Sequence, residues 1–157
     1  GRSFGIDTTI LRYFNVYGPR QAYSEYSGVI SIFINQALSN LPITIDGEGR
    51  QTRSFIHVQD VVRATMLAGE RSSAKGAVIN ISGLDQISIL DLARRIKRSI
   101  EGCTSRIIHK EARVGDVRDS IGRMEWAHKI LDFTPEIPLE QGLRNTAEWY
   151  KDNNTPM

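Results

Sequence analysis

The sequence predicts a mixed α/β fold in which strands and helices alternate along the chain. Runs rich in β-branched residues alternate with segments whose apolar residues recur at helical spacing, and glycine and proline separate them. The 157 residues, of which 40% are hydrophobic, are enough for one domain with a hydrophobic core. We find no internal repeat, low-complexity tract or linker, so the expected class is α/β or α+β.

The first predicted strand lies in the nearly continuous apolar run from Thr8 to Val16. Such a run is typical of a parallel sheet, so we expect this strand to be buried on both faces. A turn at Gly18-Pro19 and a polar loop from Gln21 to Ser27 follow. The residues Val29 to Leu38 are apolar nearly all round and predict a well-buried helix, and Ile43 to Ile45 predict a short strand.

The central stretch, Asp46 to Asp60, begins as a turn containing Gly47 and Gly49 and ends in the β-prone run Phe55 to Val58. Between them lies Arg53, which we expect to open the central strand. A turn that places an arginine at the edge of ordered structure suits an anionic ligand, because the guanidinium fork matches phosphate oxygens.

After His57 the apolar residues follow a helical period, and Asp60 is placed to cap that helix. The predicted buried face consists of Val58, Val61, Val62, Thr65 and Met66. A further strand is expected from Ala77 to Ile81.

The last third of the chain predicts three helices and one short strand. The first helix begins at Ser88, with Asp91 three residues later as in a capping box. Its expected core residues are Ile89, Leu92, Ala93, Ile96 and Ile100. The other segments are a strand at 106–109, a polar link at 111–119, a short helix around 124–131 and a final helix after Pro138. We expect the tail, 152–157, to fray.

Composition limits the function classes. A net charge of +2 is too small to predict nucleic-acid binding, and the basic run from Arg94 to Arg98 is expected to be a solvated helix face. No apolar run reaches the ~18 residues of a membrane span. The single Cys103 excludes an internal disulfide and favours a cytoplasmic protein. The three histidines lie far apart, so no metal site is expected.

Several catalytic and cofactor motifs are absent from the sequence. There is no G-x-G-x-x-G, since Thr52 occupies the third glycine position after Gly47 and Gly49. There is no G-x-S-x-G, and no tyrosine has a lysine four positions later. We therefore predict no catalytic residue in this chain.

Polar residues at the ends of predicted elements are the candidate ligands. Asn15 ends the first strand, Arg53 opens the central one, and Arg113 and Asp116 lie in the late polar link. Alternatives stay open for each: Asn15 closes a strand end, Arg53 forms a structural salt bridge, or Arg113 and Asp116 pair with each other. His57 is expected to be a packed residue.

Three segments resemble consecutive motifs of the extended short-chain dehydrogenase/reductase family. They are residues 12–21 (RYFNVYGPRQ), 47–61 (GEGRQTRSFIHVQDV) and 113–118 (RVGDVR), and the ending around 139–150 is also similar. The resemblance covers nearly the whole chain. It is strongest to the NAD-dependent nucleotide-sugar epimerases and dehydratases, notably the UDP-glucose 4-epimerases.

This resemblance implies a C-terminal half: the last strands of a Rossmann-type core plus a smaller mixed α/β substrate-binding domain, with residues 1–157 as the nucleotide-sugar-binding half. The missing N-terminal half would carry the NAD loop and the catalytic Tyr-x-x-x-Lys. The absence of an initiator Met before Gly1 and a strand-like run within eight residues also suggest a start in mid-protein.

The resemblance further implies the roles of single residues. Contacts with the nucleotide diphosphate are implied for Asn15, Arg53 and Arg113, and Asp116 would lie near the ribose. The base would be lined by Gly28, Val29, Thr44 and Ile45, and the nicotinamide of NAD would lie beside Tyr13 and Phe14. The sequence departs from the family at Asp46, where an aromatic residue usually stacks on the base, and at Ser54, where aspartate is usual.

The expected function is UDP-glucose (UDP-galactose) 4-epimerisation by the complete protein, with a UDP-sugar as substrate and this chain alone inactive. The alternatives are a related dehydratase or decarboxylase, or a non-catalytic nucleotide-binding module. The resemblance also implies a homodimer for the complete protein, formed by helices of the missing half. We expect this chain to be monomeric, with an apolar face where its first strand and helix would meet the NAD domain.

Overall fold

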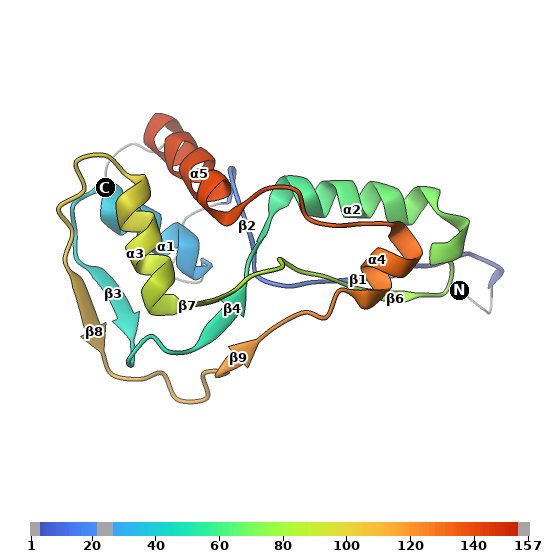
Figure 1. The fold of residues 1–157 in the computed structure, drawn as a ribbon, viewed down its shortest axis with the longest axis horizontal. Helices are drawn as coiled ribbons and strands as arrows, with labels where there is room; N and C mark the ends of the chain where they lie inside the picture. Colours follow the sequence, from blue (N-terminus) through green and yellow to red (C-terminus); the bar gives the residue numbers. More distant parts are fainter. Residues whose placement is uncertain (1–3, 22–26, 154–157) are drawn as a thin grey trace.

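The computed structural model describes residues 4–21 and 27–153 and confirms a mixed α/β fold (Figure 1). Parts of the expected N-terminal start, of the loop 21–27 and of the tail therefore lie outside the described residues. The elements in chain order are β1 (Ile10–Tyr13), β2 (Val16–Tyr17), α1 (Val29–Leu38), β3 (Ile43–Asp46), β4 (Thr52–Ser54), β5 (Ile56–His57), α2 (Val58–Glu70), η2 (Ser72–Ala74), β6 (Val78–Ile81), β7 (Gln86–Ser88), α3 (Ile89–Ser99), β8 (Ile107–Lys110), β9 (Asp119–Ser120), α4 (Glu125–Leu131) and α5 (Leu139–Asn153).

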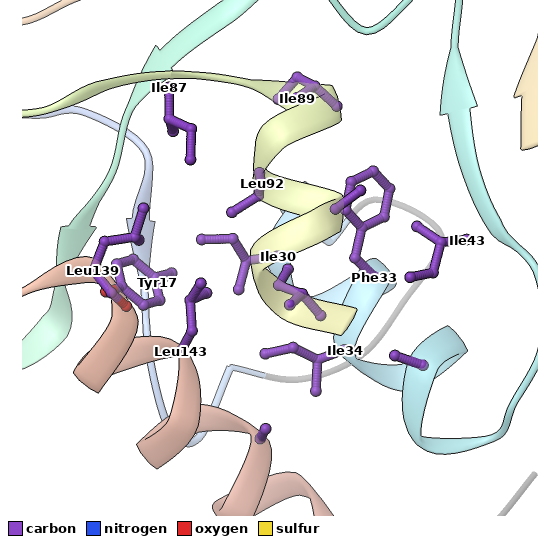
Figure 2. Close-up of a cluster of buried hydrophobic side chains, with 14 of the residues drawn as sticks. Tyr17, Ile30, Phe33, Ile34, Ile43, Ile87, Ile89, Leu92, Leu139 and Leu143 are labelled. Atoms are coloured by element: carbon purple, nitrogen blue, oxygen red, sulfur yellow. The ribbon is translucent and has the colours of Figure 1, made fainter. Parts of the chain in front are cut away.

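One hydrophobic core lies among α1, α3 and α5, beside the parallel pair β3–β8. Figure 2 shows side chains from the three helices gathered in this core: Phe33 and Ile34 of α1, Leu92 of α3 and Leu143 of α5. Ser88 caps α3 as predicted, since its hydroxyl accepts a hydrogen bond from Asp91 N at 3.1 Å. The helices predicted at 29–38, from Ser88 and after Pro138 are confirmed as α1, α3 and α5.

A second core lies among the parallel pair β1–β6, α2 and α4, at the other end of the molecule (Figure 1). Its fully buried side chains include Ile79 and Ile81 of β6 and Leu131 of α4. Phe133, just after α4, is also fully buried. The predicted strand at 77–81 and the predicted short helix near 124–131 are confirmed.

The first strand differs from its prediction. It ends at Tyr13, because Asn15 adopts a left-handed φ of 42° and turns the chain into β2, which pairs with β5 instead. Among the described residues β1 pairs only with β6, and Ile10 and Tyr13 remain 56% and 48% exposed. The prediction of burial on both faces is therefore wrong for this structure, since nothing in the described part covers the second edge.

Helix α2 also differs in part. Its buried residues include Val61, Ala64 and Ala68, whereas Val62 and Met66 lie on the opposite, exposed side. Its N-cap is His57, whose Nδ1 accepts from Gln59 N at 3.3 Å. The predicted capping role of Asp60 is wrong, because that carboxylate instead accepts from the backbone of residues 136 and 137.

Between the two cores lies the sheet β7–β4–β9, which carries the central stretch (Figure 1). Strand β4 is antiparallel to β7 and parallel to β9. At the C-terminus, α5 continues through Asp152 and Asn153, so fraying from residue 152 is not seen, and 154–157 lie outside the described residues. None of the helices in the described part combines the length and apolarity needed to cross a membrane.

Candidate functional site

Arg53 is the second residue of β4, one position later in the strand than predicted. The left-handed turns at Gly47 (φ 67°) and Gly49 (φ 72°) bring the chain from β3 into this strand. The backbone of Arg53 is opposite Ile87 of β7 and Ser120 of β9. Two ladders therefore fix the position from which this side chain extends.

The guanidinium of Arg53 is paired with the carboxylate of Asp116. The distance from Nη2 to Oδ1 is 2.8 Å, and the two side chains are 15% and 32% exposed. The salt bridge that the sequence left open for Arg53 is thus present. Asp116 and Arg113 do not pair through their side chains in the described contacts; Asp116 N donates to Arg113 O at 3.2 Å instead.

Asn15 also contacts β4. Its Nδ2 donates to the carbonyl oxygen of Ser54 at 3.0 Å, directly after Arg53 in the chain. The Asn15 side chain therefore joins the turn between β1 and β2 to β4, which agrees with the alternative that Asn15 closes a strand end. The Ser54 side chain is fully buried, and its hydroxyl has no partner among the described residues.

The residues expected to line a base lie on α1 and β3. Gly28 is the exposed N-cap of α1, and Val29 packs partly against the first core. Ile45 is fully buried and presents no surface to a ligand in this structure. Thr44 is held by Gln36, which donates to its hydroxyl at 3.0 Å and accepts from its N–H at 3.1 Å.

The end of β3 meets the connection between β8 and β9, residues 111–118. A Cβ placed on Gly47 would lie 3.3 Å from Cβ of Ala112, and Asp46 is opposite Lys110 in the β3–β8 ladder. Asp46 thus lies beside an exposed connection that carries both Arg113 and Asp116. The structure brings Asn15, Arg53 and Asp116 together around β4, and the end of β3 reaches the same connection.

Of the two residues expected beside NAD, Tyr13 ends β1 and Phe14 directly follows it. The hydroxyl of Tyr13 is 2.9 Å from Oγ1 of Thr65 on α2, so α2 orients this ring. Phe14 lies against Gly122, where a Cβ would come within 2.9 Å of its ring. Both residues lie at the carboxyl end of a strand, where ligands bind in open parallel sheets, and their place beside NAD stays a prediction.

A separate cavity of about 190 Å³ lies beside α2 and includes none of the predicted ligands. Its lining includes His57 and Asp60, both 2% exposed. Burial lowers the pKa of His57, and the Asp60 carboxylate opposes this effect. Burial also raises the pKa of the neighbouring Tyr17 phenol far above its usual range, so that group stays neutral.

Two participants were missed by the sequence reasoning. Gln36 holds Thr44, and the carbonyl oxygen of Arg118 accepts from Nη1 of Arg53 at 3.4 Å. Gln36 belongs to no sequence motif, and a contact made by a backbone carbonyl does not depend on residue type, so the sequence could identify neither. The described residues contain no cluster of His, Cys, Asp and Glu that could hold a metal ion.

Comparison of the sequence with known proteins identifies relatives in one enzyme family. The model of the NAD dependent epimerase/dehydratase family matches residues 1–82, about half of the chain. A UDP-N-acetyl-alpha-D-glucosaminuronate decarboxylase of Bacillus cytotoxicus is 32% identical over 157 residues, covering 94% of this chain and 47% of that protein.

Solved structures agree. The UDP-glucose 4-epimerase of Thermotoga maritima, solved with UDP-glucose, superposes with a TM-score of 0.89 at 37% identity, covering 96% of this chain and 48% of that one. The UDP-glucuronic acid 4-epimerase of Bacillus cereus, solved with UDP-glucuronic acid and NAD, has a TM-score of 0.86 at 33% identity, covering 96% and 47%. The chain spans about half the length of the relatives that it matches. Together with the fold, these matches show that the chain belongs to the NAD-dependent epimerase/dehydratase family.

Proposed function

We propose that this chain is the nucleotide-sugar-binding part of an NAD-dependent UDP-glucose (UDP-galactose) 4-epimerase. The observation that carries the proposal is the placement of Arg53. Its guanidinium lies between β4 and the connection 111–118, with Asn15 on the adjacent backbone and Arg113 on the same connection. A cation fixed at such a junction suits a diphosphate, because arginine can bind two phosphate oxygens at once.

The nucleoside would lie along α1 and β3, with Gly28, Val29 and Thr44 beside the base, and the fully buried Ile45 would support Thr44 from the core. Asp46, at the end of β3, offers a carboxylate where an aromatic ring would stack. Loss of such a stack costs about 1–3 kcal/mol on the scale of single-stranded nucleic acids. We therefore expect modest affinity for the base and a larger contribution from the diphosphate.

The catalytic groups would come from a second half of similar length. The sequence contains no Tyr-x-x-x-Lys and no glycine-rich dinucleotide loop, and the relatives are about twice as long. NAD, when bound, would accept a hydride from the sugar C4 and return it to the other face. This chain would bind the nucleotide and present Tyr13 and Phe14 to the cofactor, and the complete protein would be a homodimer.

One alternative reaction has an observation behind it. The decarboxylase of Bacillus cytotoxicus is as similar to this chain as several of the epimerases, and it is named for a UDP-sugar acid. A shared nucleotide-binding half serves either chemistry equally well. Epimerase and decarboxylase would therefore differ in residues near the sugar, whereas the diphosphate contacts would be the same.

Calorimetry of the 157-residue chain with UDP and with uridine tests the proposal. We expect weak binding of UDP and no measurable binding of uridine, since the diphosphate provides most of the contact. Equal affinity for both ligands, or no binding of UDP at millimolar concentration, would contradict the diphosphate site. The chain alone should not convert UDP-galactose; turnover would show that a catalyst is present in these residues.

A further inference from the structure

The guanidinium of Arg53 is held by three acceptors of the chain itself. Nη1 donates to the carbonyl oxygen of Thr52 at 2.8 Å and to that of Arg118 at 3.4 Å. Nη2 donates to Oδ1 of Asp116 at 2.8 Å. One acceptor lies on β4 and two lie on the connection 111–118, so the side chain joins the two segments.

These contacts orient the guanidinium without saturating it. An arginine has five N–H donors, and three are used here. The two that remain are one on Nη2 and the one on Nε, which have no partner among the described contacts. They belong to a side chain that is 15% exposed, so their position is defined before any ligand arrives.

Asp116 is itself fixed by a local turn. Its N–H donates to Arg113 O at 3.2 Å, and Gly115 supplies the left-handed φ of 78° that the turn needs. The turn lies on the surface, away from both hydrophobic cores. The only charged side chain that the carboxylate meets in the described contacts is Arg53.

We propose that Asp116 is a positioning residue for Arg53: with two backbone carbonyls it fixes the guanidinium so that its two remaining N–H donors serve a diphosphate. This inference rests on the proposed diphosphate site and changes the role of Asp116 within it. The sequence resemblance places Asp116 near the ribose, whereas the observed geometry places its carboxylate on the arginine.

Two opposing effects decide whether Asp116 raises or lowers the affinity for a diphosphate. Ordering a free arginine side chain on binding reduces affinity roughly two- to tenfold, and a pre-ordered one avoids that loss. A carboxylate beside the cation also competes with the anion, but a partly exposed pair contributes at most about fivefold. Because Oδ1 occupies only one of the five donors, we expect the ordering effect to exceed the competition.

The experiment measures the affinity of inorganic pyrophosphate, which has no ribose, for the 157-residue chain and its variants. Asp116→Ala should weaken binding roughly two- to tenfold. Asp116→Asn should restore most of the loss, because an amide oxygen can still accept from Nη2. The control is Asp119→Asn: this carboxylate lies on the adjacent β9, accepts from Thr52 and Gln86, and does not contact Arg53.

Three outcomes would overturn the proposal. Equal or tighter pyrophosphate binding by Asp116→Ala would indicate competition. Weaker binding of UDP but unchanged binding of pyrophosphate would indicate a ribose contact. An equal loss in Asp119→Asn would indicate a general disturbance of the β7–β4–β9 sheet, because removing a negative charge by itself favours an anionic ligand. If Asp116→Ala is unfolded, Asp116→Ser, which is too short to reach Nη2, replaces it.

If the proposed diphosphate site itself is wrong, the same binding experiment gives a different result. Arg53→Ala would then bind pyrophosphate as well as the parent, whatever Asp116 does. If Arg53→Ala abolishes binding while Asp116→Ala leaves it unchanged, the diphosphate site stands and only the positioning role fails.

Discussion

His57 combines two functions that depend on its neutral form. Its ring is buried against Tyr17, with ring centroids 5.4 Å apart, and its Nδ1 caps α2 by accepting from Gln59 N. That contact requires the tautomer with the proton on Nε2. Burial lowers the pKa of His57 because the charged imidazolium would lose its hydration. Protonation in the folded state therefore costs both hydration and the cap.

The lowered pKa predicts a loss of stability in acid. Between the unfolded pKa, near 6.5, and the lower folded pKa, the unfolded chain binds a proton that the folded chain does not. The free energy of unfolding should therefore fall as the pH drops through about 6.5 and level off below the folded pKa. Urea titrations from pH 8 to 5 measure this slope. His57→Asn, which keeps a capping oxygen but cannot titrate, should show a shallower slope; equal slopes would refute the assignment.

Helix α5 packs closely because Gly142 lacks a side chain. A Cβ there would lie 2.1 Å from Oη of Tyr17, which is 3% exposed, and 3.1 Å from Cδ2 of His57. The phenol cannot move aside easily in this core. The glycine therefore sets how near α5 can approach the strand pair β2–β5.

We expect Gly142→Ala to lower the free energy of unfolding by about 1–3 kcal/mol, since overpacking exceeds the gain in helix propensity. Gly69→Ala is the matched control: this glycine is also helical, in α2, but a Cβ added to it would meet no atom within 4 Å. It should raise the free energy of unfolding by about 0.5–1 kcal/mol. Urea unfolding of both variants measures the difference; equal stability of the two would show that α5 is not tightly packed there.

Large apolar side chains are exposed on one side of α2 and on β1, whose second edge is open in the described part of the chain. Val62 and Met66 are 54% and 61% exposed, and Ile10 on β1 is 56% exposed. Side chains of this kind are expected to pack against another body rather than water. In the proposed complete protein, the NAD-binding half would cover them.

The chain is expected to be monomeric at low concentration. The double substitution Val62→Lys and Met66→Lys should reduce the association that its apolar side chains cause at high concentration, without changing its stability by more than about 0.5 kcal/mol. Light scattering at increasing protein concentration measures the association, and urea unfolding measures the stability. Leu41→Lys, on the connection between α1 and β3, is a control with similar exposure of 52%. If the α2 substitutions leave self-association unchanged and Leu41→Lys reduces it, the chain associates through the surface around Leu41 and not through α2.

At the scale of the molecule, local sequence patterns predicted where helices and strands form better than they predicted which of their side chains are buried. The nearly continuous apolarity of 29–38 and the cap at Ser88 are properties of the nearby sequence, and the two helices that they predicted are present. The exposure of Ile10 depends on what pairs with the other edge of β1, which the local pattern cannot report. Apolar Val62 and Met66 resembled core residues for the same reason.

The site shows the same limit. The motifs indicated Asn15, Arg53 and Asp116 separately. The contact between Arg53 and Asp116 joins residues 63 positions apart, and no periodic sequence pattern predicts such a contact. The interpretation of Asp60 as a cap followed from its place in the chain. Only the fold shows the backbone of residues 136–137 against its carboxylate.

The central claim is that Arg53 binds the diphosphate of a nucleotide. Its most direct test is the dissociation constant of UDP for the parent chain and for Arg53→Ala, measured by calorimetry. Loss of a charge-assisted contact of about 1.5–3 kcal/mol predicts binding at least tenfold weaker for Arg53→Ala. Arg50→Ala should bind as the parent does, because the Arg50 side chain is 86% exposed and paired with Glu48. If Arg53→Ala binds UDP as tightly as the parent, the claim is wrong.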